Sequence, residues 1–191
     1  LTNEELVANL NVFIMAGHDT TANTLTYAMY YLAKYQDVQE KLRNEIYATL
    51  EVAPNNFDLA IPTAEHLKSM KYLSCFIKEV MRITPAVLQI DRQLSSDYTI
   101  PGENVVLPKG THLNLSVYSI QKDPRIYPNP DEFNPERFLN SKYDTDVYMP
   151  FGGGTRMCVG MNFSLMEQKV FLIMLLQKFH LNIDKNNPDF K

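Results

Sequence analysis

The most constraining feature of this chain is the segment at residues 151–160, FGGGTRMCVG. Three of the seven glycines in the 191 residues stand here in a row, just ahead of Cys158, one of only two cysteines. Glycine has no side chain and tolerates positive backbone φ angles, so a run of glycines lets a backbone lie close against another group. The segment therefore predicts a loop built around the Cys158 sulfur, and an apolar helix is expected over residues 158–178.

Several kinds of site use a glycine-rich loop or an isolated cysteine, and most of them need residues that this loop lacks. A dinucleotide fingerprint needs a glycine where the chain has Met157, and a phosphate loop needs lysine and then serine or threonine directly after Gly160. Zinc needs partner cysteines or histidines at ligand spacing, and Cys158 has none nearby. A nucleophilic cysteine stays open, although no histidine flanks it. The chemistry that remains is a thiolate bound to haem iron.

The neighbours of Cys158 suit that chemistry. Glycines let a backbone lie flat against a planar cofactor and turn its N–H groups toward the sulfur. Those donors, together with the N-terminal end of the following helix, favour the thiolate over the thiol. Arg156 is a fixed cation two residues before the cysteine and suits a haem propionate. Phe151 can screen the sulfur from water, and Gly160 lets the helix pass close to the ring.

The loop resembles the haem-binding signature of the cytochrome P-450 superfamily, the haem-thiolate monooxygenases, in the pattern Phe151-x-x-Gly154-x-Arg156-x-Cys158-x-Gly160. Glu167, nine residues beyond the cysteine, also fits this signature. The resemblance implies a haem b whose iron is bound by the Cys158 thiolate. The cofactor-binding residues that it implies are Phe151, Gly152, Gly154, Arg156, Cys158, Gly160, Arg92 and Ala16.

A second motif, AGHDTT at residues 16–21, lies within a predicted helix. One interpretation of the motif is a plain polar stripe on the helix. Gly17 argues against it, because glycine costs about 1 kcal/mol relative to alanine inside a helix. Thr20 can donate its hydroxyl to a carbonyl one turn back and open the helix locally. The stretch resembles the family's oxygen-activation motif. The resemblance implies that Thr20 is hydrogen-bonded to oxygen at the haem and that Asp19 relays protons.

A third motif pairs Glu79 with Arg82 at i, i+3 in the stretch EVMR. By itself such a pair is usually exposed and contributes about 0.2–0.5 kcal/mol. In the family the same spacing forms a buried triad with a later arginine, and Asn134-Pro135-Glu136-Arg137-Phe138 resembles the family's Pro-Glu-Arg-Phe segment. The resemblance implies a structural triad of Glu79, Arg82 and Arg137 that holds the irregular loop under the haem.

The segment after Pro85 carries two further expectations from the resemblance. Arg92 is expected to bind a second propionate, with an exposed charge on an edge strand as the alternative. Val87 and Leu88 are expected to face the substrate, with plain core residues as the alternative.

The chain departs from the family's pattern at a few positions, none of them in the central chemistry. They are Gln121 where histidine or a similar residue is common, Tyr127 where tryptophan is common and Ser164 where alanine is usual. The glutamine puts a propionate contact at that position in doubt. The other cysteine, Cys75, lies in an apolar helical pattern and is expected to be a core thiol.

Periodicity and turn residues predict a mainly α fold with minor antiparallel β. Helices are expected at residues 3–34, behind an N-cap at Thr2, at 37–50, in a short stretch from 63, at 72–83 and at 158–178. Strands are expected at 87–93, 98–100, 104–107, 112–117 and 180–184, with residues 123–150 irregular. The resemblance implies the C-terminal part of the cytochrome P-450 fold. Residues 1–191 would be one partial haem-thiolate monooxygenase domain, running from the central oxygen-binding helix through the cysteine loop to the following helix.

The resemblance implies a haem-dependent monooxygenase that inserts one oxygen atom of O2 into an apolar organic substrate. Electrons would come from NADPH through a flavoprotein reductase. Arg156 and the Pro-Glu-Arg-Phe segment are typical of the eukaryotic microsomal type, which implies the endoplasmic reticulum membrane, at its cytoplasmic face. The alternatives are a haem-thiolate isomerase or dehydratase, against which Asp19 and Thr20 argue, and a truncated, non-catalytic haem-binding fragment.

Charge and hydrophobicity limit the partners of the chain. The formal net charge of −4 gives no bulk attraction to nucleic acid. The longest apolar run, residues 170–176, is far shorter than the roughly 20 residues that span a bilayer. Since Leu1 stands directly before a helical pattern, we expect a piece of a longer protein that lacks the N-terminal half, with its membrane anchor, and the extreme C-terminus. That piece is expected to be inactive alone.

Overall fold

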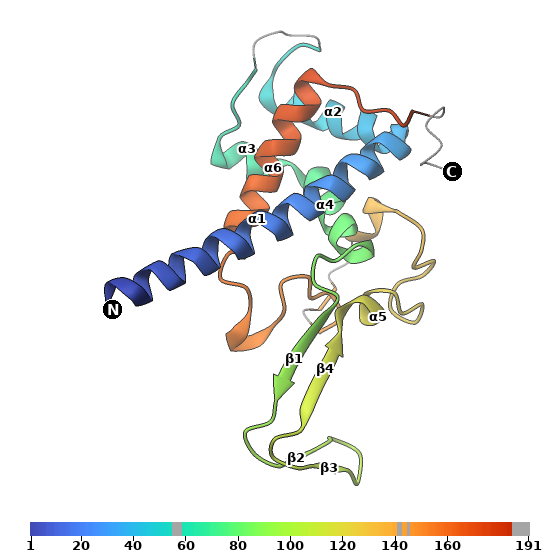
Figure 1. Cartoon of the computed structure of the whole chain (residues 1–191). Coiled ribbons are helices and arrows are strands. Elements are labelled where there is room, and N and C mark those ends of the chain that lie inside the picture. Colours follow the sequence, from blue (N-terminus) through green and yellow to red (C-terminus); the bar gives the residue numbers. More distant parts are fainter. Residues whose placement is uncertain (55–58, 141–142, 145, 185–191) are drawn as a thin grey trace.

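A computed structural model describes residues 1–54, 59–140, 143–144 and 146–184 (Figure 1). The long helices of the described part are α1 (Asn3–Lys34), α2 (Gln36–Leu50), α4 (Lys71–Ile83) and α6 (Met161–Lys178). Shorter helical elements are α3 (Ala64–Ser69), α5 (Val117–Gln121), and the 3-10 turns η1 (Pro135–Phe138) and η2 (Gly154–Arg156). The strands are β1 (Gln89–Gln93), β2 (Tyr98–Thr99), β3 (Val106–Leu107) and β4 (His112–Ser116). The prediction of a mainly α fold with minor antiparallel β is confirmed.

Helix ends follow from local sequence chemistry. At the start of α1 a capping box forms, because Glu5 N donates to Thr2 Oγ1 at 3.2 Å and Thr2 N donates to Glu5 Oε2 at 2.8 Å. The end of α4 is set in the same local way: the helix stops at Ile83, and Thr84 is its C-cap. Pro85 follows directly, and the residue before a proline is disfavoured in the α conformation.

The main core lies where the C-terminal half of α1 packs with α2, α4 and α6 (Figure 1). Each of these helices turns an apolar face inward, and Phe133 from the loop before η1 joins them. Fully buried side chains at its centre are Leu32, Leu42, Ile46, Leu73, Phe76, Leu172, Ile173 and Leu176. A smaller cluster of Cys75, Tyr127 and Phe138 packs on the other side of α4, so the expected core thiol is buried.

The strands build a narrow arm that projects from the helical body (Figure 1). β1 pairs antiparallel with β4, with Gln89 opposite Ser116 and Gln93 opposite His112. Nearer the tip of the arm β2 pairs antiparallel with β3, with Tyr98 opposite Leu107. The chain then returns from β4 through α5 to the helical body, so that the arm joins it next to the end of α4.

Two sequence expectations fail for identifiable reasons. The strand expected at residues 180–184 does not form, because the backbone N–H and carbonyl of Leu181 are both bonded to the Gln39 side chain. Residue 117, expected as the end of a strand, instead begins α5, because the Ser116 hydroxyl accepts the Ser119 N–H and caps a helix.

The last helix is a core element. It was expected from residue 158 but begins at Met161, with Gly160 as its N-cap. Its apolar stretch supplies Leu172, Ile173 and Leu176 to the core. In the described part of the chain, no helix combines the length and the apolar character needed to cross a bilayer.

Candidate functional site

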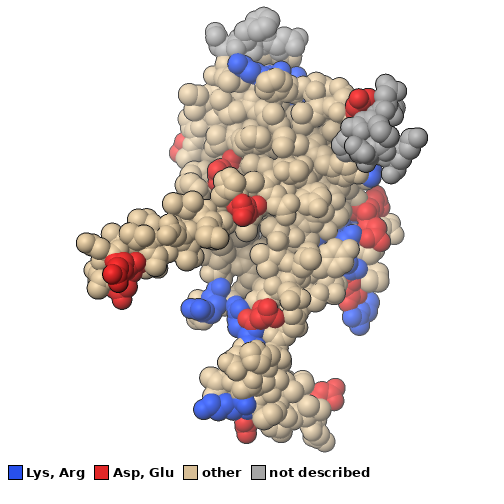
Figure 2. Space-filling view, viewed as in Figure 1, with Lys and Arg blue, Asp and Glu red and all other residues tan. Residues whose placement is uncertain are grey.

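A cavity of about 820 Å³ lies between the middle of α1, the segment from residue 86 to β1, the cysteine loop and the first turns of α6. Figure 2 shows a hollow beneath the projecting α1, with arginine or lysine side chains at its lower edge. Most of the residues singled out in the sequence line this cavity: Ala16, Thr20, Val87, Arg92, Phe151, Gly152, Arg156, Cys158 and Gly160. Segments more than 130 residues apart in sequence therefore meet at one site.

The cysteine loop owes its shape to two glycines. Gly152 and Gly154 have φ angles of 74° and 67°, a region that other residues rarely adopt. Gly152 N donates to Met149 O at 3.0 Å, and Cys158 N donates to Phe151 O at 2.9 Å, which closes the loop. The backbone thus turns back on itself, and the cysteine lies just before the N-terminus of α6.

Cys158 carries an exposed thiol that lines the cavity. Gly160 leaves room beside it, since a Cβ there would lie 3.9 Å from the sulfur. The backbone donors expected at the sulfur are not seen: among the hydrogen bonds of the described residues, none reaches Cys158 Sγ. Two of the nearby N–H groups are engaged elsewhere, since Cys158 N closes the loop and Met161 N donates to Cys158 O at 3.4 Å.

Two arginines line the same cavity as the thiol. Arg156 comes from η2 and Arg92 from β1. Arg92 Nη1 donates to the Asp91 carbonyl at 2.8 Å, and neither guanidinium belongs to an ion pair of the described residues. With two planar cations beside a largely apolar wall, the cavity suits a ligand that carries carboxylates on an apolar body.

The middle of α1 presents its polar motif along the cavity. Thr20 Oγ1 donates to Ala16 O at 2.8 Å, as expected, but α1 stays continuous from Asn3 to Lys34 and is not opened. Asp19 does not line the cavity; its carboxylate is 85% exposed and lies 2.8 Å from His18 Nδ1. The sequence reading gave His18 no role, yet its side chain lines the cavity.

The structure separates the two residues that were expected to face substrate. Val87 lines the cavity, whereas Leu88 is exposed and lies outside it. The Leu88 carbonyl accepts the Tyr118 N–H at 3.1 Å. Gly154 also lies outside the lining, so its role is in the turn rather than at the cavity wall.

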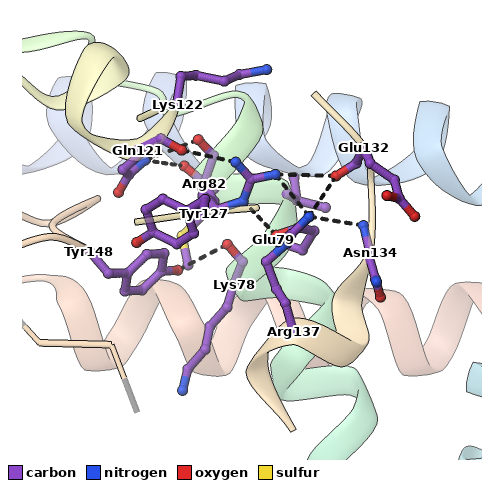
Figure 3. A network of polar contacts seen from close by, with 12 residues as sticks. Lys78, Glu79, Arg82, Gln121, Lys122, Tyr127, Glu132, Asn134, Arg137 and Tyr148 are labelled. Carbon is purple, nitrogen blue, oxygen red and sulfur yellow. Dashed lines mark hydrogen bonds and ion pairs between the residues drawn. The ribbon is translucent and has the colours of Figure 1, made fainter. Parts of the chain in front are cut away.

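Glu79, Arg82 and Arg137 come together in one buried network (Figure 3). Arg82 Nε lies 2.7 Å from Glu79 Oε2, and Arg137 Nε lies 2.9 Å from Glu79 Oε1. The side chains of Glu79 and Arg82 are 0% exposed, and that of Arg137 is 8% exposed. Glu79 and Arg82 therefore do not form an exposed pair on the helix surface. α4 is thereby joined to η1 through charge.

Backbone groups complete this network (Figure 3). Asn134 N donates to Glu79 Oε1 at 2.9 Å, while Arg82 donates to the carbonyls of Gln121 at 2.9 Å and Glu132 at 3.3 Å. Arg82 also lies over the Tyr127 ring, 5.1 Å from its centroid. Buried charges need this degree of hydrogen bonding to be tolerated. The network therefore fixes the loop at residues 128–134 against α4.

A second polar link, which the sequence reading missed, joins α1 to α6 at the cavity. Thr21 Oγ1 lies 3.0 Å from Ser164 Oγ, which also accepts Gln168 Nε2 at 2.9 Å. All three residues line the cavity, and Gln168 is buried. The signal in the sequence was a serine and a glutamine at i, i+4 on an otherwise apolar helix face.

Comparison with known proteins gives a consistent result. The model of the family Cytochrome P450 matches residues 1–191. Cytochrome P450 3A29 of Sus scrofa is 42% identical over 182 residues, which cover 94% of this chain and 35% of that protein. Cytochrome P450 3A5 of Homo sapiens is 40% identical over 181 residues, 94% of this chain and 34% of that protein. Cytochrome P450 6a2 of Drosophila melanogaster is 36% identical over 183 residues, with 94% and 35% covered. The chain spans about a third of the length of these relatives.

Proposed function

The chain belongs to the cytochrome P450 family, and we propose that it forms the haem-binding part of a monooxygenase that inserts one oxygen atom of O2 into an apolar organic substrate. Membership of the family implies a haem cofactor. The observation that carries the proposal is the cavity in which the Cys158 thiol and the guanidiniums of Arg92 and Arg156 meet the small residues of α1.

The residues of the cavity fit such a group. Its volume of about 820 Å³ lies within the roughly 300–1,000 Å³ usual for ligand pockets. The lining is largely apolar, and its polar groups include the Glu167 carboxylate and the His18 ring as well as one thiol and two guanidiniums. The thiol and the two guanidiniums match an iron atom and two carboxylates on a flat apolar ring. Gly160 leaves the space beside the sulfur free of a side chain.

Each residue then has a physical role. Cys158 supplies the thiolate ligand, and Arg156 and Arg92 hold the propionates. Phe151, Gly152, Gly160 and Ala16 shape the contact surface, and Gly154 supports it through the turn of the cysteine loop. When bound, the haem supplies the redox chemistry that activates O2, and a cysteine ligand favours cleavage of the O–O bond. Val87 contributes apolar wall on the substrate side.

The polar residues of α1 would deliver protons. The Thr20 hydroxyl lines the cavity and now donates to Ala16 O; rotation about χ1 turns it toward a ligand there. Asp19 is an exposed carboxylate on the next residue and can exchange protons with water. The pair thus offers an acid group and a hydroxyl donor in sequence along one helix.

The whole protein would need partners outside this chain. We propose electron delivery from NADPH through a flavoprotein reductase, and attachment to the cytoplasmic face of the endoplasmic reticulum membrane. The support is the similarity to vertebrate and insect relatives together with Arg156 and the Pro-Glu-Arg-Phe segment.

Spectroscopy of the full-length protein tests the assignment. Reduced protein with carbon monoxide is expected to show the red-shifted Soret band of a thiolate-ligated haem, and Cys158→Ser is expected to abolish it. Cys75→Ala is the matched control, because Cys75 is buried in the smaller core cluster, outside the cavity lining, and its loss is expected to keep the band. An unchanged band in Cys158→Ser would contradict the assignment.

A further inference from the structure

Gln121 lies between the buried network and the cysteine loop. It is the last residue of α5 and is 0% exposed. Val117, one turn earlier on α5, lines the cavity, whereas Gln121 does not. Figure 3 shows its side chain next to Arg82, at the end of α4.

Both polar atoms of the Gln121 side-chain amide have protein partners. Nε2 donates to Met81 O and to Arg82 O, each at 3.1 Å, and Oε1 accepts Met149 N at 3.2 Å. Both N–H donors of the amide are thereby used. No donor remains for a carboxylate in the cavity, unlike at Arg92 and Arg156.

The partners of Gln121 lie at a helix end and at the start of the cysteine loop. Met81 and Arg82 belong to the last turn of α4, where the backbone carbonyls accept no hydrogen bond from within the helix. Met149 opens the turn into the cysteine loop, since its carbonyl accepts Gly152 N at 3.0 Å. From there, Phe151 O accepts Cys158 N at 2.9 Å. One buried amide thus connects the end of α4 with the backbone that carries the cysteine.

We infer that Gln121 is a positioning residue that fastens the cysteine loop to the buried Glu79–Arg82–Arg137 network, and that it is not a ligand of the cofactor. The same residue reinforces the network directly, because Arg82 Nη1 donates to the Gln121 carbonyl at 2.9 Å. Its effect on haem rests on the proposed function, whereas its effect on the loop does not.

Amide hydrogen exchange of Met149 in the full-length, haem-free protein tests the loop directly. In Gln121→Met the side chain keeps its length but loses all three hydrogen bonds, so exchange at Met149 is expected to rise by roughly two- to tenfold. Gln121→Asn keeps the amide, but its side chain is one methylene too short to reach Met149 N and the carbonyls of Met81 and Arg82 together, so exchange at Met149 is expected to rise as in Gln121→Met. If Gln121→Met does not fold, Gln121→Asn decides: exchange at Met149 equal to that of the wild type would overturn the inference.

Gln39 supplies a matched control. It is also 0% exposed, its Nε2 donates to two carbonyls, at 3.0 and 2.9 Å, and its Oε1 accepts Leu181 N at 2.8 Å. Gln39→Met therefore removes the same set of hydrogen bonds at a site outside the cavity lining. It is expected to lower stability as Gln121→Met does but to leave Met149 exchange unchanged.

The rate of haem loss from the loaded protein separates the remaining outcomes. Gln121→Met is expected to accelerate haem loss and to lower the thiolate fraction of the carbon monoxide spectrum, while Gln39→Met does neither. Faster haem loss with unchanged Met149 exchange would identify a direct haem contact and overturn the inference. If the wild-type protein itself gives no thiolate spectrum, the proposed function fails, and Met149 exchange still decides the positioning role.

Discussion

α4 and the first half of α1 both carry motifs of the family, but their side chains are held in different ways. From Leu73 to Ile83 most of α4 is buried, and its charged residues meet partners from other parts of the chain. Every residue from 1 to 20 is exposed, and the polar contacts of Asp19 and Thr20 are local to the helix. In Figure 1 this half of α1 extends away from the helical body.

The difference separates two physical tasks. A buried charge needs several fixed partners, so the α4 network must be completed by the fold. The contacts of Asp19 and Thr20 within this chain are local, which leaves both side chains free to turn, as the proton delivery proposed for them requires. We therefore expect changes in α4 to affect stability and haem binding together. Changes in the α1 motif are expected to affect chemistry with little loss of stability.

The largest effect is expected for Glu79→Ala. The substitution leaves Arg82 as a buried charge without its carboxylate, and removal of one partner from such a network destabilises by about 3–5 kcal/mol. Urea unfolding and haem content of the full-length protein measure the loss. Glu136→Gln is the control, because Glu136 pairs with Lys41 on the surface, where both side chains are about half exposed, and no measurable change is expected.

Cooperation within the network is tested by a double-mutant cycle. Because Glu79 bonds both arginines, Glu79→Ala with Arg137→Ala is expected to be scarcely worse than Glu79→Ala alone. Fully additive and mild effects would instead mean that the three side chains act separately. In that case the charges of α4 would be no more interdependent than the polar residues of α1.

A large effect on chemistry, with a small one on stability, is expected for Thr20→Ala. Its hydroxyl bonds only the carbonyl one turn back, so the unfolding midpoint is expected to stay nearly constant. Consumption of NADPH is expected to shift from product to hydrogen peroxide, because proton delivery fails. Thr26→Ala is the matched control: Thr26 Oγ1 makes the same bond, to Ala22 O at 2.8 Å, but lies outside the cavity. Unaltered coupling in Thr20→Ala would disprove the role.

Loss of the hydrogen bonds between α1 and α6 at Ser164 is expected to lower stability by an intermediate amount. Ser164→Ala removes the hydroxyl that is hydrogen-bonded to both Thr21 and Gln168, and the net cost of a hydrogen bond is about 0.5–1.5 kcal/mol. Thermal unfolding of Ser164→Ala, Thr21→Val and the double variant measures the coupling. A double variant equal to the sum of the two singles would show that the hydroxyls do not act together.

The sequence predicted those features whose interactions lie between neighbouring residues. Thr2 and Glu5 form their cap within one turn, and the glycines of the cysteine loop act on their own backbone, so the sequence alone predicts both features. The Thr21–Ser164 bond joins residues 143 apart, and although Ser164 and Gln168 mark a polar spot on α6, nothing local identifies Thr21 as the partner. Only the family resemblance connected Arg137 with Glu79, since a sequence of one chain does not contain that proximity.

Polar side chains that bind backbone explain the remaining misses. The Gln39 side chain is hydrogen-bonded to both backbone groups of Leu181, which prevents the strand expected at residues 180–184. Gln121 departs from the family pattern in the sequence, but its three partners lie in two segments that only the fold brings together. Buried amides of this kind look like surface residues in a sequence, because composition does not reveal what they bond.

The smallest effect is expected at the rim of the network, where Asp123 begins the turn that leads to Tyr127. Its carbonyl accepts Tyr127 N at 2.8 Å, and hydrogen bonds from the Arg125 side chain and backbone lower the pKa of its carboxyl to about 2. A pKa lowered by folding stabilises the protein above the unfolded value of about 3.9, and this contribution is lost as the pH falls toward 2. Asp123→Asn lacks it, so the stability difference between wild type and variant is expected to shrink from pH 5 to pH 3 in urea unfolding. Titration of all other carboxyls is common to both proteins and cancels. Arg125→Met is expected to reduce the same pH dependence, because it removes the side-chain donor. A difference that stays constant over this range would mean that the pair at the rim, unlike the buried charges of α4, does not contribute to stability through its ionisation.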